Sequence, residues 1–132
     1  MKILIVDDSR FLRIANERAL TRAGYEVICA ADGEEGLRMA TDQKPDLVVL
    51  DMLLPKLSGP EVLRALRQNP ETASIPVMVL TSLPQTNEQK LIKEGATSYF
   101  AKSGLMLDQG PGLFVATVEK MLHKDEAAAV SG

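Results

Sequence analysis

Three aspartates stand at the ends of apolar runs, and their type and spacing suit the binding of a hard metal ion. Asp7 and Asp8 follow the apolar residues 3–6, and Asp51 follows the apolar residues 47–50. Short apolar runs bounded by polar residues are typical of buried strands that end at the rim of a sheet. Three carboxylates gathered there would repel one another unless a cation offset their charge. An all-oxygen site of this kind suits Mg²⁺, which commonly accompanies phosphoryl chemistry.

A hydroxyl and an ammonium group follow two later apolar runs, so five polar side chains would share one site. A carboxylate can accept a phosphoryl group to give an aspartyl phosphate, and this transfer requires mainly positioning and charge neutralisation. Asp8 and Asp51 could hold Mg²⁺ directly, while Asp7 binds its waters. Thr81 and Lys102 would then contact the remaining phosphoryl oxygens. These residue types do not decide which of the three aspartates is the nucleophile.

The elements that must position these side chains alternate along the chain. Strands are predicted over residues 2–6, 25–30, 46–50, 76–80 and 98–101. Helical patterns lie between the strands and after the last one, which favours an α/β fold with a parallel sheet and helices on both faces. Right-handed crossovers place the carboxyl ends of all the strands at one edge, where open sheets bind ligands.

The predicted helices have recognisable start signals. They begin after Ser9 or Asp8, at Asp32-Gly33, after Ser58 with Glu61 at capping-box spacing, after Thr86 with Gln89 at the same spacing, and near Pro111, the last running to about Lys124. Gly24 is predicted to end the first helix. The expected apolar positions of that helix are Phe11, Leu12, Ala15, Ala19 and Leu20.

Composition indicates one soluble domain without an affinity for membranes or nucleic acid. The 132 residues are 45% hydrophobic and 25% charged, with a formal charge of −3. No apolar run approaches the ~20 residues that cross a bilayer, and no signal peptide precedes Met1-Lys2. Cys29 is the only cysteine, so it has no internal disulfide partner. We interpret it as a core residue of a protein in the reducing cytoplasm.

Several motifs, each at a predicted strand end, follow one another in a distinctive order. They are Ile5-Val6-Asp7-Asp8, Asp51-Met52-Leu53-Leu54-Pro55 with Gly59, Thr81-Ser82, and Tyr99-Phe100-Ala101-Lys102. On these motifs the chain resembles a bacterial response-regulator receiver domain over roughly residues 2–124. The resemblance implies a flavodoxin-like, doubly wound sheet of five parallel strands in the order 2-1-3-4-5. Residues 1–124 would form the receiver domain and residues 125–132 a flexible tail or linker stub.

The resemblance also assigns the phosphoryl acceptor and the metal ligands. Asp51 would be the phosphoacceptor. Asp8 would bind Mg²⁺ directly and Asp7 through water, with the backbone carbonyl of Leu53 as a further ligand.

Four further residues receive roles around the phosphoryl group from the same resemblance. Lys102 and Thr81 would hold the phosphoryl oxygens, and Ser82 would be the small neighbour that keeps the pocket open. Tyr99 resembles the aromatic residue that turns inward when Thr81 moves toward the phosphoryl group.

The implied function is that of a phosphoacceptor switch in a two-component signalling system. A histidine kinase or a histidine phosphotransfer protein would donate to Asp51, and a downstream protein would bind the altered surface. Such a domain is not an enzyme beyond catalysing its own phosphorylation and dephosphorylation. We expect a monomer or a weak phosphorylation-dependent dimer, with no direct contact to nucleic acid or membrane. The chain would be a stand-alone receiver or one cut from a longer chain.

The chain departs from the usual receiver pattern after Lys102. Receivers follow this lysine with proline in a cis bond, whereas Ser103 follows here, so a trans bond is expected. The loop over residues 103–112 is also longer than usual. Leu53 and Leu83, two positions past Asp51 and Thr81, should shield the aspartyl phosphate from water and make its hydrolysis slow.

Other interpretations remain open at this level. Asp7-Asp8 could simply cap the first helix, and His123 is interpreted as a solvated residue near a helix end. A receiver-shaped interaction module would not use phosphorylation. A Mg²⁺-dependent phosphatase with an aspartate nucleophile resembling the haloacid dehalogenases needs Asp-x-Asp, which Asp7-Asp8-Ser9 does not supply. A flavin-binding protein of similar fold needs a phosphate loop where the two acids stand.

Overall fold

Five parallel strands form a single sheet. The structure is a computed structural model and describes residues 1–52, 54, 56–81, 92–93, 95–101 and 112–122. The strands are β1 (Lys2–Val6), β2 (Glu26–Ala30), β3 (Leu47–Asp51), β4 (Val77–Thr81) and β5 (Ser98–Ala101). Their order in the sheet is β2-β1-β3-β4-β5, and each neighbouring pair is parallel. The predicted strand order is confirmed.

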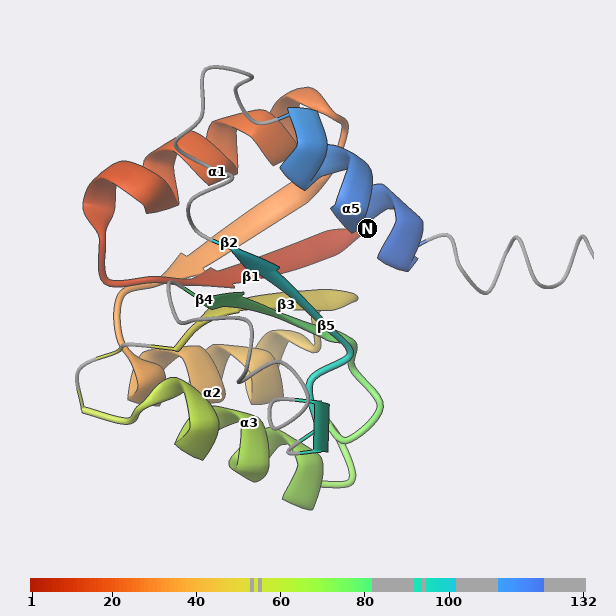
Figure 1. The fold of residues 1–132 in the computed structure, drawn as a ribbon. Helices are drawn as coiled ribbons and strands as arrows, with labels where there is room; N and C mark the ends of the chain where they lie inside the picture. The colour runs from red at the N-terminus through yellow and green to blue at the C-terminus, as the bar shows by residue number, and fades with distance from the viewer. Residues whose placement is uncertain (53, 55, 82–91, 94, 102–111, 123–132) are drawn as a thin grey trace, which may run out of the picture.

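Helices cover both faces of the sheet, as predicted. They are α1 (Arg10–Arg22), α2 (Gly33–Gln43), α3 (Gly59–Gln68) and α5 (Gly112–Leu122). Figure 1 shows α1 and α5 on one face and α2 and α3 on the opposite face. Among the described residues no helix is long and apolar enough to cross a membrane.

The strand residues divide between two hydrophobic clusters according to the twofold alternation of strand side chains. In β1, Ile3 and Ile5 pack with the cluster that includes Phe114 of α5. Leu4 and Val6 belong to the opposite cluster, under α2 and α3. All four β1 side chains are fully buried. Burial on both faces explains why the strand is a continuous apolar run rather than an alternating one.

Two strands begin and end one residue later than predicted. Residues 46–50 and 76–80 were expected, but β3 ends at Asp51 and β4 at Thr81. Asp51 pairs with Leu80, and Thr81 pairs with Ala101, so the ladder continues through both polar residues. The backbone of Asp51 is thereby fixed by the sheet itself.

The predicted capping residues begin three of the helices. The Ser9 hydroxyl accepts a hydrogen bond from the backbone N–H of Leu12. The Asp32 carboxylate accepts one from Glu35, and the Ser58 hydroxyl accepts one from Glu61. These bonds satisfy N–H groups that the first turn leaves without helical partners. The starts of α1, α2 and α3 are therefore specified locally.

The expected apolar face of α1 is partly wrong. Phe11 is 74% exposed, whereas Asn16, Ala19 and Leu20 are buried. At 3.6 residues per turn, Phe11 lies about 180° around the helix from Leu20, so one side chain cannot face the sheet with the other. Ala15 is also exposed. The apolar stripe is narrower than the residue types indicated.

Some expectations fall on residues outside the described part of the chain. These are the helix after Thr86, the Lys102–Ser103 bond, the loop over residues 103–111, His123 and the tail over residues 125–132. Gly24, predicted to end α1, follows its C-cap and has a φ of +100°. This backbone conformation favours glycine.

Candidate functional site

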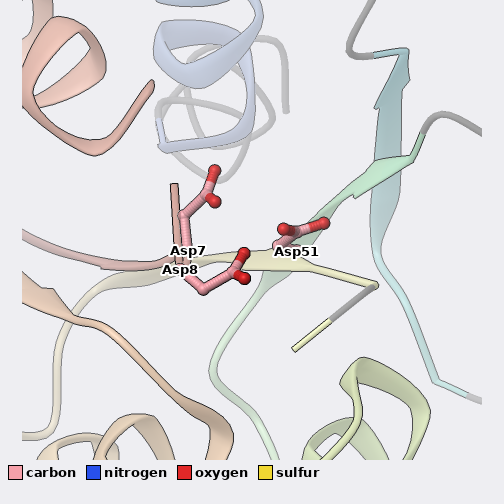
Figure 2. A group of neighbouring side chains, drawn as sticks. All are labelled: Asp7, Asp8 and Asp51. Carbon is pink, nitrogen blue, oxygen red and sulfur yellow. The ribbon is translucent and has the colours of Figure 1, made fainter. Parts of the chain in front are cut away.

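Three carboxylates from two neighbouring strands meet at the carboxyl edge of the sheet. Asp7 and Asp8 follow β1, and Asp51 ends β3. One carboxylate oxygen from each lies within 4.8 Å of those from the other two. Asp7 and Asp51 are buried, whereas Asp8 is exposed. Figure 2 shows Asp8 reaching toward the strand that carries Asp51.

The register of the sheet brings these residues together. Val6 of β1 pairs with Leu50 of β3, so the next residue of each strand is Asp7 or Asp51. Parallel neighbours in register end at the same level. The juxtaposition of these acids is therefore a consequence of strand pairing, and it does not depend on a long flexible loop.

Asp7 is held through its backbone and its side chain. Its N–H donates to the carbonyl oxygen of Ala30, at 3.1 Å. Its Oδ1 accepts from the backbone N–H of Ser9, at 2.9 Å. Its carbonyl oxygen accepts from Nη1 of Arg13, at 2.9 Å. Three directional bonds thus fix the residue that precedes Asp8.

A glycine allows the start of α3 to approach Asp51 closely. A Cβ on Gly59 would lie 2.6 Å from the carbonyl oxygen of Asp51 and 2.6 Å from Cα of Met52. The N–H of Gly59 donates to the carbonyl of Met52, at 3.1 Å. Real Cβ atoms do not approach backbone so closely, so only glycine fits here without a shift.

The loop that leads from β3 to α3 is also joined to the start of α2. Lys56 has a φ of +68°, and its Nζ lies 3.6 Å from a carboxylate oxygen of Asp32. Gly33 packs against the carbonyl oxygen of Leu57. The pKa of Asp32 is lowered chiefly by its hydrogen bond from the Glu35 N–H, and further by the charge of Lys56. The contacts of Lys56 and Leu57 with α2 therefore hold the loop only a few residues after Asp51 in the sequence.

The chemistry of the cluster fits a hard divalent cation. Carboxylate oxygens are the ligands that Mg²⁺ and Ca²⁺ select, and Mg²⁺ takes one or two carboxylates and keeps several waters. Three acids within 4.8 Å of one another repel, and a bound cation would offset that repulsion. The cluster could therefore hold a metal ion.

The remaining predicted site residues are described in part or not at all. Thr81 is the last residue of β4, next to Ala101, and Tyr99 lies in β5, paired with Val79. Leu53, Ser82, Leu83 and Lys102 lie outside the described residues. The backbone of Thr81 therefore ends at the same sheet edge as Asp51.

Two contacts near the cluster were not predicted from the sequence. The bond from Arg13 to Asp7 joins residues six apart, across a strand end and a helix start. Helical periodicity gives no sign of such a contact. The Lys56–Asp32 pair depends on a left-handed backbone conformation at a lysine, which residue type does not indicate.

Curated relatives share most of this chain. A regulator of alkaline phosphatase synthesis, PhoP of Bacillus subtilis, is 40% identical over 131 residues, covering 98% of this chain and 52% of that protein. The response regulator MprA of Mycobacterium avium is 35% identical over 132 residues, covering 99% of this chain and 57% of that protein. The chain therefore spans about half the length of these relatives.

Solved structures share the fold. The chemotaxis response regulator CheY4 of Vibrio cholerae superposes with a TM-score of 0.82 at 31% identity, covering 90% of this chain and 96% of that one. The BeF3-activated receiver domain of RstA from Klebsiella pneumoniae gives 0.81 at 27% identity, covering 92% and 98%. The sequence profile of the response regulator receiver domain matches residues 3–106. This chain belongs to the response regulator receiver domain family.

Proposed function

We propose that this chain is a phosphoacceptor switch, in which Asp51 accepts a phosphoryl group in a Mg²⁺-dependent reaction. The observation that carries the proposal is the cluster of Asp7, Asp8 and Asp51 within 4.8 Å, at the edge where the sheet of a receiver ends. Asp51 is 1% exposed, and its backbone is held in the β3–β4 ladder. A fixed carboxylate beside a cation site suits in-line attack on phosphorus.

We assign the metal ligands as the receiver family implies them. Asp8 and Asp51 would bind Mg²⁺ directly, Asp7 would bind through water, and the backbone carbonyl of Leu53 would complete the protein ligands. The bound cation supplies charge neutralisation to the non-bridging phosphoryl oxygens. The three bonds that hold Asp7 support its place in this set, because they fix its backbone and one carboxylate oxygen before any ligand arrives.

In the transfer step, a carboxylate oxygen of Asp51 attacks the phosphorus of a phosphohistidine. An O–P bond forms as the N–P bond breaks, and the electron pair returns to the imidazole nitrogen, which takes a proton from solvent. Lys102 and Thr81 would hold the phosphoryl oxygens, because an ammonium and a hydroxyl can both donate to them. The donor would be a histidine kinase or a histidine phosphotransfer protein.

The phosphorylated state would be transmitted through β4 and β5. Thr81 would move toward the phosphoryl group and Tyr99 would turn inward, which changes the surface that a downstream protein binds. Ser82 would leave room for the phosphoryl group, while Leu53 and Leu83 would restrict water and slow hydrolysis.

The remaining features of the proposal follow from composition and the family. Residues 1–124 would form the receiver and residues 125–132 a tail, in the cytoplasm. With a formal charge of −3 the receiver would not bind nucleic acid itself. It would act as a monomer or as a weak phosphorylation-dependent dimer. It would catalyse only its own phosphorylation and dephosphorylation.

Intact-mass measurement after incubation with acetyl phosphate and Mg²⁺ tests the proposal. The wild-type chain should gain one phosphoryl adduct. No adduct should form when EDTA replaces Mg²⁺ or when the protein is Asp51→Asn. Asp42→Asn, an exposed acid of α2, is the matched control and should be phosphorylated normally. An adduct that persists in Asp51→Asn would move the acceptor to another residue. Absence of an adduct in all three proteins, with a histidine phosphodonor as well as acetyl phosphate, would contradict the proposal.

A further inference from the structure

We propose that Arg13 is a positioning residue for the metal site, because it fixes the peptide that joins Asp7 to Asp8. Its Nη1 donates to the carbonyl oxygen of Asp7 at 2.9 Å. The inference rests on the proposed function for the identity of the cation. It concerns a residue of α1 whose side chain need not touch the metal.

The peptide between Asp7 and Asp8 determines where the Asp8 carboxylate points. Asp7 is already held on its other side by the bond from its N–H to Ala30 and by the bond from Ser9 to its Oδ1. The bond from Arg13 adds a contact at the carbonyl oxygen, which belongs to the peptide that leads to Asp8. A fixed carbonyl fixes the plane of the following peptide, since the peptide unit is planar.

Asp8 depends on this backbone support more than its neighbours do. It is exposed, and no hydrogen bond or ion pair joins its carboxylate to another described residue. Asp51, in contrast, is buried and ends a paired strand. Of the two proposed direct ligands, Asp8 therefore has the less constrained side chain, and the direction of its Cα–Cβ bond follows from the peptide that Arg13 holds.

The surroundings of Arg13 on α1 include a negative charge. Arg13 is half-buried, and Glu17 lies one helical turn further along α1. Glu17 accepts a hydrogen bond from the Cys29 thiol of β2, at 3.3 Å. A positive charge at this position also favours the gathering of negative charge beside it. Arg13 thus connects α1 to the backbone at the end of β1.

Mg²⁺ titration of the ¹⁵N-labelled protein, followed by amide chemical shifts, measures the role of Arg13 without any phosphoryl transfer. Arg13→Met removes the donor while keeping an unbranched side chain, and should raise the Mg²⁺ midpoint about five- to tenfold. Arg13→Gln should do the same, and Arg13→Lys, which keeps a charged donor, should recover part of the affinity. Arg18→Met, an exposed arginine of the same helix, is the matched control and should bind like wild type.

Urea unfolding of the same proteins separates positioning from stability. A merely structural role would lower the urea midpoint of Arg13→Met and leave its Mg²⁺ midpoint within about twofold of wild type, which would overturn the inference. If Arg13→Met does not fold, Arg13→Gln decides by the same criterion. A wild-type protein that shows no Mg²⁺ response would instead contradict the metal site of the proposed function. Failure of the inference and failure of the function are therefore distinguishable.

Discussion

The two ends of the sheet accommodate charge in opposite ways. Beside the amino ends of β4 and β5, the guanidinium of Arg67 donates to the carbonyl oxygens of Gly95, Ala73 and Ile75, at 2.9, 2.9 and 2.7 Å. A weaker bond reaches the Thr97 hydroxyl at 3.4 Å. At the carboxyl ends of β1 and β3, three carboxylates of like charge lie within 4.8 Å of one another.

The difference separates a charge that joins neighbouring segments from a group of charges that repel one another. Arg67 contacts neutral oxygens from two segments, residues 73–75 and 95–97, so its bonds hold α3, the following loop and the start of β5 together. Burial lowers the pKa of Arg67, but the four acceptors compensate for lost hydration. The acidic cluster gathers groups that repel, which reduces stability at a place where a cation can bind. The following predictions perturb one end of the sheet, or the region between the ends, and measure which properties change.

The largest effect on stability is expected from Arg67→Met. The substitution removes the donor of three backbone carbonyls in partly buried positions, so the free energy of unfolding should fall by about 2–4 kcal/mol. The Mg²⁺ midpoint should not change, because the guanidinium contacts no part of the acidic cluster. Urea unfolding and Mg²⁺ titration measure the two quantities. Arg64→Met, exposed on the same helix, should change neither. A weaker Mg²⁺ midpoint in Arg67→Met would mean that the two ends are coupled.

A smaller loss is expected from Gly59→Ala, at the opposite end. The new Cβ would meet backbone atoms of Asp51 and Met52 at 2.6 Å, so the start of α3 must shift, at a cost of about 1–3 kcal/mol. Because the displaced atoms belong to Asp51, the proposed phosphoacceptor, and to Met52 beside it, acetyl phosphate should label the variant more slowly than wild type.

Gly24→Ala provides the matched control for that substitution. Gly24 has a φ of +100° and nothing within 4 Å of its would-be Cβ, so alanine there is strained but collides with nothing. It should lose about 1–2 kcal/mol of stability and be labelled at the wild-type rate. Equal labelling rates in both glycine variants would show that Gly59 supports the fold without positioning Asp51.

A moderate effect on stability is expected from Mg²⁺, which should act at the acidic cluster and not at Arg67. At ten times its dissociation constant, Mg²⁺ should stabilise the wild-type protein by about 1.4 kcal/mol. Without Mg²⁺, Asp8→Asn should be more stable than wild type by about 0.5 kcal/mol, because one of three like charges is removed. It should gain little from Mg²⁺. Urea unfolding with Mg²⁺ or with EDTA checks both signs, and a wild-type protein that is stabilised equally by Na⁺ at matched ionic strength would contradict a specific site.

The acidic end of the sheet was easier to predict from the sequence than the end that carries Arg67. Acids that directly follow apolar runs can be located from strand pairing alone, since parallel strands in register bring their ends together. The bonds of Arg67 reach residues up to 30 positions away in the chain, and no local pattern specifies them. The exposure of Phe11 was missed for a related reason: its residue type indicated burial, but its angle on α1 placed it on the outer side. Residue type and periodicity thus predict strands and their ends better than they predict long-range side-chain bonds.

The smallest effect concerns Cys29, which belongs to neither charged end of the sheet. The reactivity of its thiol depends on the charges of Glu17 and Arg13 on α1. Burial, followed by the hydrogen bond to Glu17, raises the pKa of the Cys29 thiol to about 12. Alkylation requires the thiolate, so Cys29 should react slowly with iodoacetamide at pH 8, and the rate should rise about tenfold per pH unit while the pKa lies well above the pH.

Glu17→Gln removes a negative charge that disfavours the thiolate, so the pKa of Cys29 should fall and alkylation at pH 8 should become several-fold faster. Glu34→Gln, an exposed acid of α2, should leave the rate unchanged. Arg13→Met should act in the opposite direction, because the positive charge of Arg13 lowers the same pKa, and a faster reaction in that variant would indicate that the α1 face had opened to solvent.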